Sequence, residues 1–115
     1  MAVPFVFFDL RTPDVAASRA FYAQLFGWVA ADGPMPMLTD GGAPWAGFTP
    51  LAPDDARRPQ WVPYAPVDDL DQATGRAVAL GATLVRGRTE LPVGSLTVIE
   101  DPAGATIVLW EARRQ

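Results

Sequence analysis

A series of signals repeated at an offset of 55 positions constrains the fold more than any other feature of this sequence. Apolar or small residues recur twice at helical spacing, and each member of the second stripe lies 55 positions after its counterpart. The first stripe is Val15, Ser18, Tyr22 and Leu25, and the second is Leu70, Ala73, Ala77 and Leu80. Gly27 and Gly81 follow the two stripes, and glycine is a common residue at helix ends. The pattern predicts helices near residues 14–26 and 69–80 in two copies of one module.

Strand-like runs and cap residues precede both predicted helices. Residues 3–10 lead into Thr12-Pro13-Asp14, with Thr12 as the expected N-cap, and residues 61–67 lead into Asp68-Asp69. Turn signals follow each helix, at Asp40-Gly41-Gly42 and at Asp101-Pro102-Ala103-Gly104. We therefore expect one α+β domain over residues 1–115, built from two βαβββ modules at about 1–52 and 60–115 with a proline-bearing linker between them.

Composition excludes several kinds of chemistry. The chain has no histidine and no cysteine, which removes the commonest metal ligand and the usual partners of nucleophilic catalysis. All nine basic residues are arginines, so a Schiff base on a lysine is also excluded. A net charge of −4 argues against nucleic acids and anionic membranes as partners. A neutral or cationic small molecule is the expected ligand.

Targeting signals are not evident in the sequence. The apolar N-terminal run lacks a preceding basic region and reaches Asp9 early, which is unlike a signal peptide. No stretch approaches the roughly 20 apolar residues of a membrane span. The expected location is the cytoplasm.

The motifs of both modules resemble those of the vicinal oxygen chelate superfamily, which contains glyoxalase I, extradiol dioxygenases, fosfomycin-resistance enzymes and bleomycin-resistance proteins. The matching motifs are residues 8–14, Ala20-Phe21-Tyr22 and Leu25-Phe26-Gly27-Trp28 in the first module, and Val67-Asp68-Asp69-Leu70, Leu80-Gly81-Ala82 and residues 101–105 in the second. The resemblance covers nearly the whole chain. It implies a U-shaped, barrel-like sheet of eight strands around a cavity, with one helix outside each half.

The same resemblance locates the positions at which catalytic members of that superfamily hold a divalent metal. These positions fall here at Phe7, Val62, Val108 and a site near Ala46 or Gly47. None of these side chains has a nitrogen or oxygen donor, and a divalent ion needs several. We therefore predict no metal and no cofactor.

Strand alternation predicts which residues line the cavity. If Phe7 faces it, Phe5, Asp9 and Arg11 face it too, whereas Phe8 and Leu10 pack under the helix. The candidate ligand-binding residues are Phe7, Asp9, Arg11, Trp45, Tyr64, Val108 and Trp110. Two alternatives stay open: the side chains could fill a closed interior, and Asp9 with Arg11 could form a salt bridge at the rim that contributes little.

These observations predict a metal-free small-molecule-binding protein of the bleomycin-resistance type, which sequesters a hydrophobic or aromatic compound. The alternative is a cofactor-independent isomerase, cyclase or lyase that uses the same cavity, with Asp9, Arg11 or Tyr64 as acid, base or anion holder. An interaction module is a third possibility, and the chain could be a monomer or a homodimer. Arg86 and Arg88 are expected on an exposed strand edge, and the acids at 68, 69 and 71 are expected to cap a helix rather than bind calcium.

Overall fold

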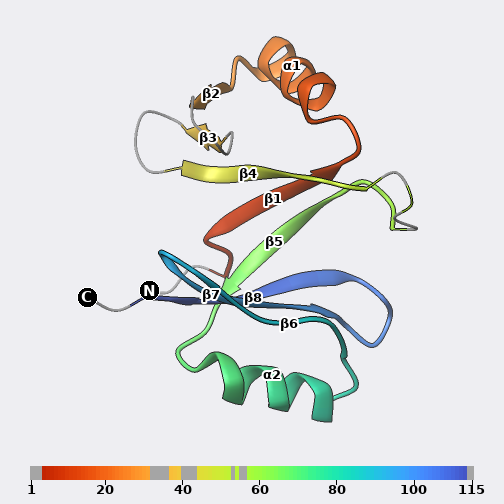
Figure 1. Cartoon of the computed structure of the whole chain (residues 1–115), viewed down its shortest axis with the longest axis vertical. Helices are drawn as coiled ribbons and strands as arrows, with labels where there is room; N and C mark the ends of the chain where they lie inside the picture. Colours follow the sequence, from red (N-terminus) through yellow and green to blue (C-terminus); the bar gives the residue numbers. More distant parts are fainter. Residues whose placement is uncertain (1–3, 32–36, 40–43, 53, 55–56, 114–115) are drawn as a thin grey trace. The chain divides into compact units, whose positions relative to one another are not determined.

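Each of the two helices follows one strand and precedes three more, as the sequence predicts. The computed structural model describes residues 4–31, 37–39, 44–52, 54 and 57–113 (Figure 1). In chain order the elements are β1 (Phe7–Thr12), α1 (Val15–Phe26), β2 (Val29–Ala31), β3 (Met37–Thr39), β4 (Pro44–Pro50), β5 (Gln60–Pro66), α2 (Leu70–Ala79), β6 (Thr83–Leu91), β7 (Gly94–Glu100) and β8 (Thr106–Ala112). Neither helix of this described part is long and apolar enough to cross a membrane.

The chain divides into two compact units. The N-terminal unit is Phe7–Val62, and the C-terminal unit combines Pro63–Gln115 with Met1–Val6. The backbone N–H of Val6 donates to the carbonyl of Tyr64 at 2.9 Å, which ties the start of the chain to β5. The predicted first module, at about 1–52, therefore differs from the observed unit at both of its ends.

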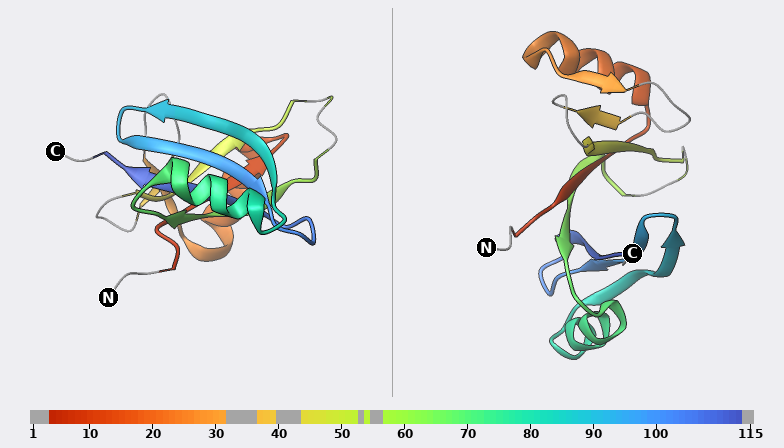
Figure 2. Two further views of the ribbon diagram at one scale, coloured as in Figure 1. Left: turned by 90° about the horizontal axis from the view of Figure 1, so that it is seen from below. Right: turned by 90° about the vertical axis from the view of Figure 1, so that its left-hand side faces the viewer.

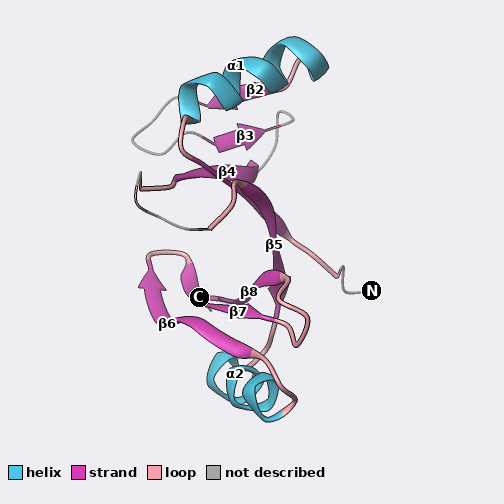
Figure 3. Cartoon of the chain, turned by 90° about the vertical axis from the view of Figure 1, so that its right-hand side faces the viewer, coloured by secondary structure: helices cyan, strands magenta, loops and turns pink. Residues whose placement is uncertain are grey.

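Both units have the same strand order, which confirms the α+β fold with two βαβββ modules. The order is β2-β3-β4-β1 in the N-terminal unit and β6-β7-β8-β5 in the C-terminal unit. In each, the first strand pairs in parallel with the last, β1 with β4 and β5 with β8, and the other neighbours are antiparallel. The helix lies against its own unit's strands, α1 against β2 and β4, and α2 against β6, β7 and β8 (Figures 2 and 3).

The N-cap of α1 lies two residues after the predicted one. Asp14, not Thr12, is the N-cap, and its side chain accepts a hydrogen bond from the Ala17 N–H at 3.0 Å. Thr12 is the last residue of β1, and its hydroxyl accepts from the Asp14 N–H and hydrogen-bonds to the Ser18 hydroxyl. Thr12 and Asp14 are both good caps, and the hydrogen bonds of Thr12 hold it in the strand that leads to the helix.

The other helix ends and the second turn follow the sequence signals. Asp69 caps α2 by accepting from the Gln72 N–H at 3.0 Å, as predicted. Gly27 and Gly81 have φ angles of 73° and 108°, a left-handed conformation that disfavours other residues. In the turn between β7 and β8, the Asp101 carboxylate accepts from the N–H groups of Ala103 and Ala105. The predicted Asp40-Gly41-Gly42 turn lies outside the described residues.

Each unit has its own core. The core of the N-terminal unit contains Leu10, Leu38, Ala46 and Phe48, with aromatic side chains packed against it. A core cluster of the C-terminal unit contains Leu70, Ile99 and Leu109, and β7 is buried from Gly94 to Ile99. Val15 and Tyr22 of the first predicted stripe, and Leu70, Ala73 and Ala77 of the second, belong to or pack against their unit's core. The last members of the stripes, Leu25 and Leu80, are 57% and 69% exposed.

Candidate functional site

A buried carboxylate is the main polar feature of β1. Asp9 is 4% exposed. Its Oδ1 accepts a hydrogen bond from the Thr49 hydroxyl at 2.9 Å, and its Oδ2 accepts from Nε of Arg11 at 3.4 Å. Parallel pairing explains the geometry, because Asp9 lies opposite Gly47 and Arg11 lies opposite Thr49 on β4. The Arg11 side chain is 11% exposed, so this ion pair is buried, unlike the rim salt bridge that the sequence left open.

An aromatic ring lies beside this carboxylate. A Cβ atom added to Gly47 would lie 3.2 Å from the Phe7 ring and 3.7 Å from Asp9 Oδ1. The glycine therefore leaves room for Phe7 and Asp9 to approach β4 on one face. Phe8 and Leu10 belong to the other face, where they pack with side chains of α1. The alternation predicted along this strand is observed from Phe7 onward.

Two residues predicted for the same site lie elsewhere. Phe5 precedes β1 and belongs to the C-terminal unit. Trp45 packs edge-on against Trp28, with ring centroids 4.8 Å apart, in the cluster beneath α1. The cause is a β-bulge, because Leu38 pairs with Ala46 while Thr39 pairs with Pro44, which leaves Trp45 as an extra residue on β4.

The remaining candidates come together in the C-terminal unit. Tyr64 lies opposite Val108 across the β5–β8 pair, and the rings of Tyr64 and Trp110 are 6.0 Å apart. Val108 is fully buried. A Cβ atom at Gly94 would lie 2.6 Å from the Trp110 ring, so β7 needs glycine where Trp110 lies across it.

The positions that correspond to metal ligands in catalytic members of the superfamily do not fit a metal ion. Ala46, Val62 and Val108 are each 0% exposed, and their hydrocarbon side chains have no lone pairs to donate. Phe7 and Gly47 likewise lack donor atoms. No catalytic step through a metal follows from this set of residues.

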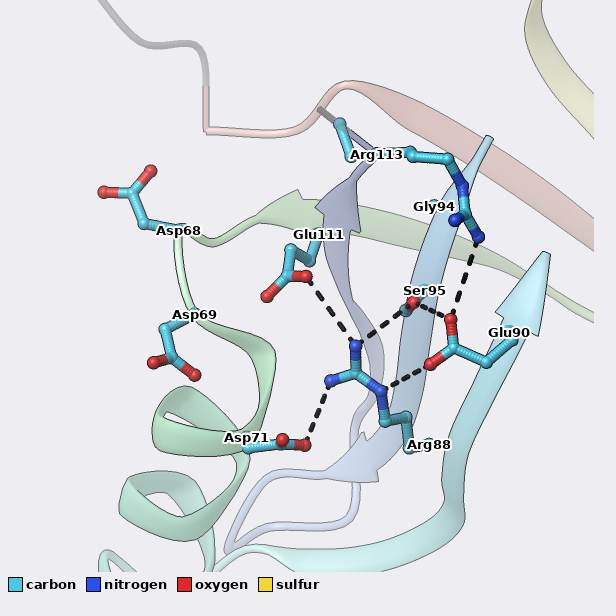
Figure 4. A pocket seen from close by; sticks show the side chains of 10 residues that line it. Asp68, Asp69, Asp71, Arg88, Glu90, Gly94, Ser95, Glu111 and Arg113 are labelled. Carbon is cyan, nitrogen blue, oxygen red and sulfur yellow. Dashed lines mark hydrogen bonds and ion pairs between the residues drawn. The ribbon is translucent and has the colours of Figure 1, made fainter. Parts of the chain in front are cut away.

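The structure also forms a polar pocket that the sequence did not predict. A cavity of about 420 Å³ in the C-terminal unit is lined by Asp68, Asp69, Asp71, Arg88, Glu90, Gly94, Ser95, Glu111, Ala112 and Arg113 (Figure 4). Arg88 is at its centre and forms ion pairs with Asp71 at 3.1 Å, Glu90 at 2.6 Å and Glu111 at 3.7 Å. Arg88 is therefore part of an ion-pair network and is not simply solvated at a strand edge.

Hydrogen bonds shift the ionisation of two groups in this network. A hydrogen bond from the Ser95 hydroxyl, followed by one from Arg88, lowers the pKa of Glu90. Hydrogen bonds to Glu90 and then to Asp71 raise the pKa of Arg88. Glu111 accepts from the first N–H of α2, at Leu70, at 2.8 Å. Sequence reasoning singled out Arg88 and Asp71 but neither Glu90 nor Glu111, and their meeting depends on α2 packing against β6 and β8.

The strand order, the paired helices and the strand-face residues define a protein of the paired βαβββ class. The chain belongs to the glyoxalase-like domain family, whose model matches residues 5–110. This match confirms the resemblance to the vicinal oxygen chelate superfamily.

Relatives and solved structures extend the comparison. CFP32 of Mycobacterium tuberculosis, whose name carries the word glyoxylase, is 34% identical over 92% of this chain and 44% of its own length. The anthracycline biosynthesis protein DnrV of Streptomyces peucetius is 32% identical over 90% of this chain and 45% of its own. The chain thus spans less than half the length of these curated relatives.

Structural similarity at low identity supports the fold alone. Methylmalonyl-CoA epimerase from Mycobacterium tuberculosis matches with a TM-score of 0.64 at 18% identity, over 99% of this chain and 94% of the epimerase. The Mn(II)-bound glyoxalase from Novosphingobium aromaticivorans matches with a TM-score of 0.65 at 17% identity, over 97% of this chain and 41% of the glyoxalase.

Proposed function

We propose that this chain is a metal-free small-molecule-binding protein of the bleomycin-resistance type, which holds a hydrophobic or aromatic compound. The observation that carries the proposal is the buried Asp9, oriented by Thr49 and Arg11 beside the Phe7 ring. Ligand sites are commonly apolar and aromatic, with a few oriented polar groups. A carboxylate can accept about four hydrogen bonds, so the two described here leave acceptor capacity for a ligand.

The names of two relatives support the proposal of an aromatic ligand. Two of them, DnrV and DauV from Streptomyces, are named as anthracycline biosynthesis proteins. We extend to this chain the class of compound that those names imply, a flat polycyclic molecule with polar substituents. Phe7 in the N-terminal unit is the aromatic residue proposed to contact it, beside Asp9 and Arg11. Tyr64, Val108 and Trp110 form a separate candidate contact surface within the C-terminal unit.

An enzymatic role for the same residues is the second candidate, because the names of DnrV and DauV refer to biosynthesis. A cofactor-independent isomerase, cyclase or lyase would need an acid or base, and Asp9 or Tyr64 could supply it. The hydrogen bonds from Thr49 and Arg11 hold the Asp9 carboxylate in one orientation, which favours a binding role. With a net charge of −4, no lysine and no cysteine, the chain fits a cytoplasmic protein that binds neither nucleic acid nor membranes.

Calorimetry on variants of Asp9 tests the proposal. Aromatic compounds that quench tryptophan emission are screened first, and the best binder is titrated into wild type and Asp9→Asn. Loss of a charge-assisted partner should weaken binding by about 1.5 to 3 kcal/mol. Arg11→Ala should also weaken it, and the double variant should lose less than the sum of the single losses. The matched control is Asp54→Asn, which removes an exposed acid and should not change affinity.

The outcomes separate the two functions. Unchanged affinity in Asp9→Asn, with an unaltered thermal unfolding curve, would contradict a site on this strand face. Chemical conversion of the bound compound, monitored by chromatography, would support the enzymatic role instead. A stoichiometric divalent metal in the purified protein, lost together with binding on chelation, would contradict the metal-free proposal.

A further inference from the structure

Arg11 is a largely buried cation that leaves most of its hydrogen-bonding capacity unused. Its side chain is 11% exposed. A guanidinium carries several N–H donors in a planar fork, and in Arg11 the Nε atom donates to Asp9 Oδ2 at 3.4 Å. Among the described residues, neither of the terminal nitrogens, Nη1 and Nη2, has a hydrogen-bond partner. The N–H donors on these two nitrogens are therefore available to a ligand.

The terminal nitrogens of Arg11 reach solvent although most of the side chain is covered. Within the part of the chain that the structure describes, no buried side-chain nitrogen or oxygen lacks a hydrogen-bond partner. Because Nη1 and Nη2 have no partner, they belong to the solvent-accessible part of the side chain. The guanidinium thus has an open outer edge, while its inner nitrogen, Nε, is held by Asp9.

Neighbouring residues of the N-terminal unit orient this open edge. Thr49 lies opposite Arg11 on β4, and its hydroxyl donates to Asp9 Oδ1 at 2.9 Å. Asp9 is therefore fixed through one oxygen and fixes Arg11 through the other. Phe7 lies on the same strand face, and four residues of a strand span about 13 Å, so only an elongated ligand reaches both Phe7 and Arg11.

We propose that the open edge of Arg11 binds a carboxylate of the ligand, which makes the ligand an elongated aromatic carboxylic acid. A planar carboxylate accepts two parallel hydrogen bonds from the planar edge of a guanidinium. A phosphate group carries more negative charge and a third acceptor oxygen, and a single arginine already paired with Asp9 is a poor match for it. The Phe7 ring contacts the aromatic part of the same molecule.

This inference rests on the proposed function, because it concerns the same strand face. It differs from the neutral or cationic ligand that the net charge of −4 predicts. Net charge describes the whole surface, and salt screens charges that lie more than about 10 Å apart in solvent. A guanidinium in direct contact with the ligand determines the preferred charge at the site itself.

A matched pair of aromatic probes, anthracene-2-carboxylate and its neutral amide, tests the proposal. The two compounds have the same rings and nearly the same shape. Fluorescence titration of the wild-type chain at neutral pH should give a dissociation constant at least about tenfold lower for the carboxylate. Arg11→Lys keeps a cation to pair with Asp9 but lacks the planar fork, so it should lose most of this preference.

Arg86→Lys is the matched control. It makes the same exchange at an exposed strand residue of the C-terminal unit and should retain the preference of the wild type. Circular dichroism establishes that both variants fold. NMR of the guanidinium carbon of Arg11 adds a measurement on the wild-type chain alone. The carboxylate should shift this signal, and the amide should leave it nearly unchanged.

The outcomes distinguish failure of this inference from failure of the proposed function. Equal affinity for the two probes, tighter binding of the amide, an unshifted Arg11 signal or an unreduced preference in Arg11→Lys would each overturn the carboxylate contact alone. The same holds if neither probe binds although other aromatic compounds of the screen do. If no aromatic compound binds at all, the proposed function fails and this inference fails with it.

Discussion

In the N-terminal unit, aromatic rings pack beneath α1. In the C-terminal unit, aliphatic side chains of α2, β7 and β8 pack together, and ion-paired side chains line a polar pocket. Trp28 stacks on Phe26 and Tyr22, and the indole N–H of Trp61 donates to the Tyr22 hydroxyl at 3.0 Å. In the other unit, Leu70 is fully buried, and the Glu111 carboxylate accepts from the Leu70 N–H. The strand order is the same in both.

The difference shows that caps, turns and strand order can repeat while the packing does not. Asp14 and Asp69 cap the two helices in the same way, and Gly27 and Gly81 follow them. These local features set the topology. The side chains that fill each unit are free to differ, so one unit could specialise in aromatic packing and the other in a polar pocket.

Removal of Trp28 should have the largest effect and would show how far the N-terminal unit depends on its rings. Trp28 contacts Phe26, Tyr22 and Trp45, so Trp28→Ala should lower the free energy of unfolding by about 3 to 5 kcal/mol. Denaturant unfolding measures the loss, and amide hydrogen exchange should quicken more in β4 than in β7. Equal acceleration in both strands would mean that the aromatic cluster stabilises the whole chain and not one unit.

A methyl group on Gly94 should have an intermediate effect and tests the close packing of the C-terminal unit. The new Cβ would lie 2.5 Å from the Glu111 carbonyl oxygen and 2.6 Å from the Trp110 ring. Gly94→Ala should therefore lower the free energy of unfolding, measured by thermal unfolding, by about 1 to 3 kcal/mol. Gly75→Ala is the control, because nothing lies within 4 Å of its Cβ in α2, and it should stabilise by about 0.5 to 1 kcal/mol. Similar melting temperatures for the two variants would contradict the packing described for β7.

Loss of the Ser95 hydroxyl should have the smallest effect and tests the polar side of the comparison. Ser95 donates to Glu90 at 2.6 Å and lowers its pKa, so folding favours the ionised form. This contribution is present above the ordinary pKa of glutamate and is lost as the pH falls through the lowered pKa of the folded state. Ser95→Ala should raise the pKa of Glu90 in a carboxyl NMR titration and weaken the pH dependence of stability in that acidic range.

The control for this titration lies in the other unit. Ser18 hydrogen-bonds to Thr12, far along the chain from Glu90, and Ser18→Ala should leave the Glu90 titration unchanged. A shift of equal size in both variants would show that the titration reports general destabilisation.

Much of the fold could be predicted because its signals are local. Three features depend only on contacts within a few residues, so residue type and spacing predict them. They are the helix cap at Asp69, the glycines that follow the two helices, and the turn at Asp101. The true cap of α1 was missed because Thr12 and Asp14 are both competent, and the choice depends on the hydrogen bond between Thr12 and Ser18.

The strand faces of the candidate site residues could be predicted in part for the same reason. Alternation correctly placed Phe7, Asp9 and Arg11 on the face of β1 opposite Leu10, but it gave no sign that Thr49, 40 positions from Asp9, completes the group. Trp45 was misplaced because a bulge adds one residue and changes the face. The pocket around Arg88 needs a contact with Asp71 across 17 positions. Such distant pairings come from tertiary packing and leave no periodic mark in the sequence.

The parallel pairing of first and last strands affects the order in which the chain can fold as it is synthesised. Every strand of the N-terminal unit is available once the ribosome has released Val62, so this unit can form while the rest is still being translated. β5 cannot pair with β8, its parallel partner, until about 40 more residues have been synthesised. Glu111 then reaches the Leu70 N–H and fixes α2. During that interval the emerged β5 lacks its β8 partner, and such an unpaired strand edge is prone to aggregation.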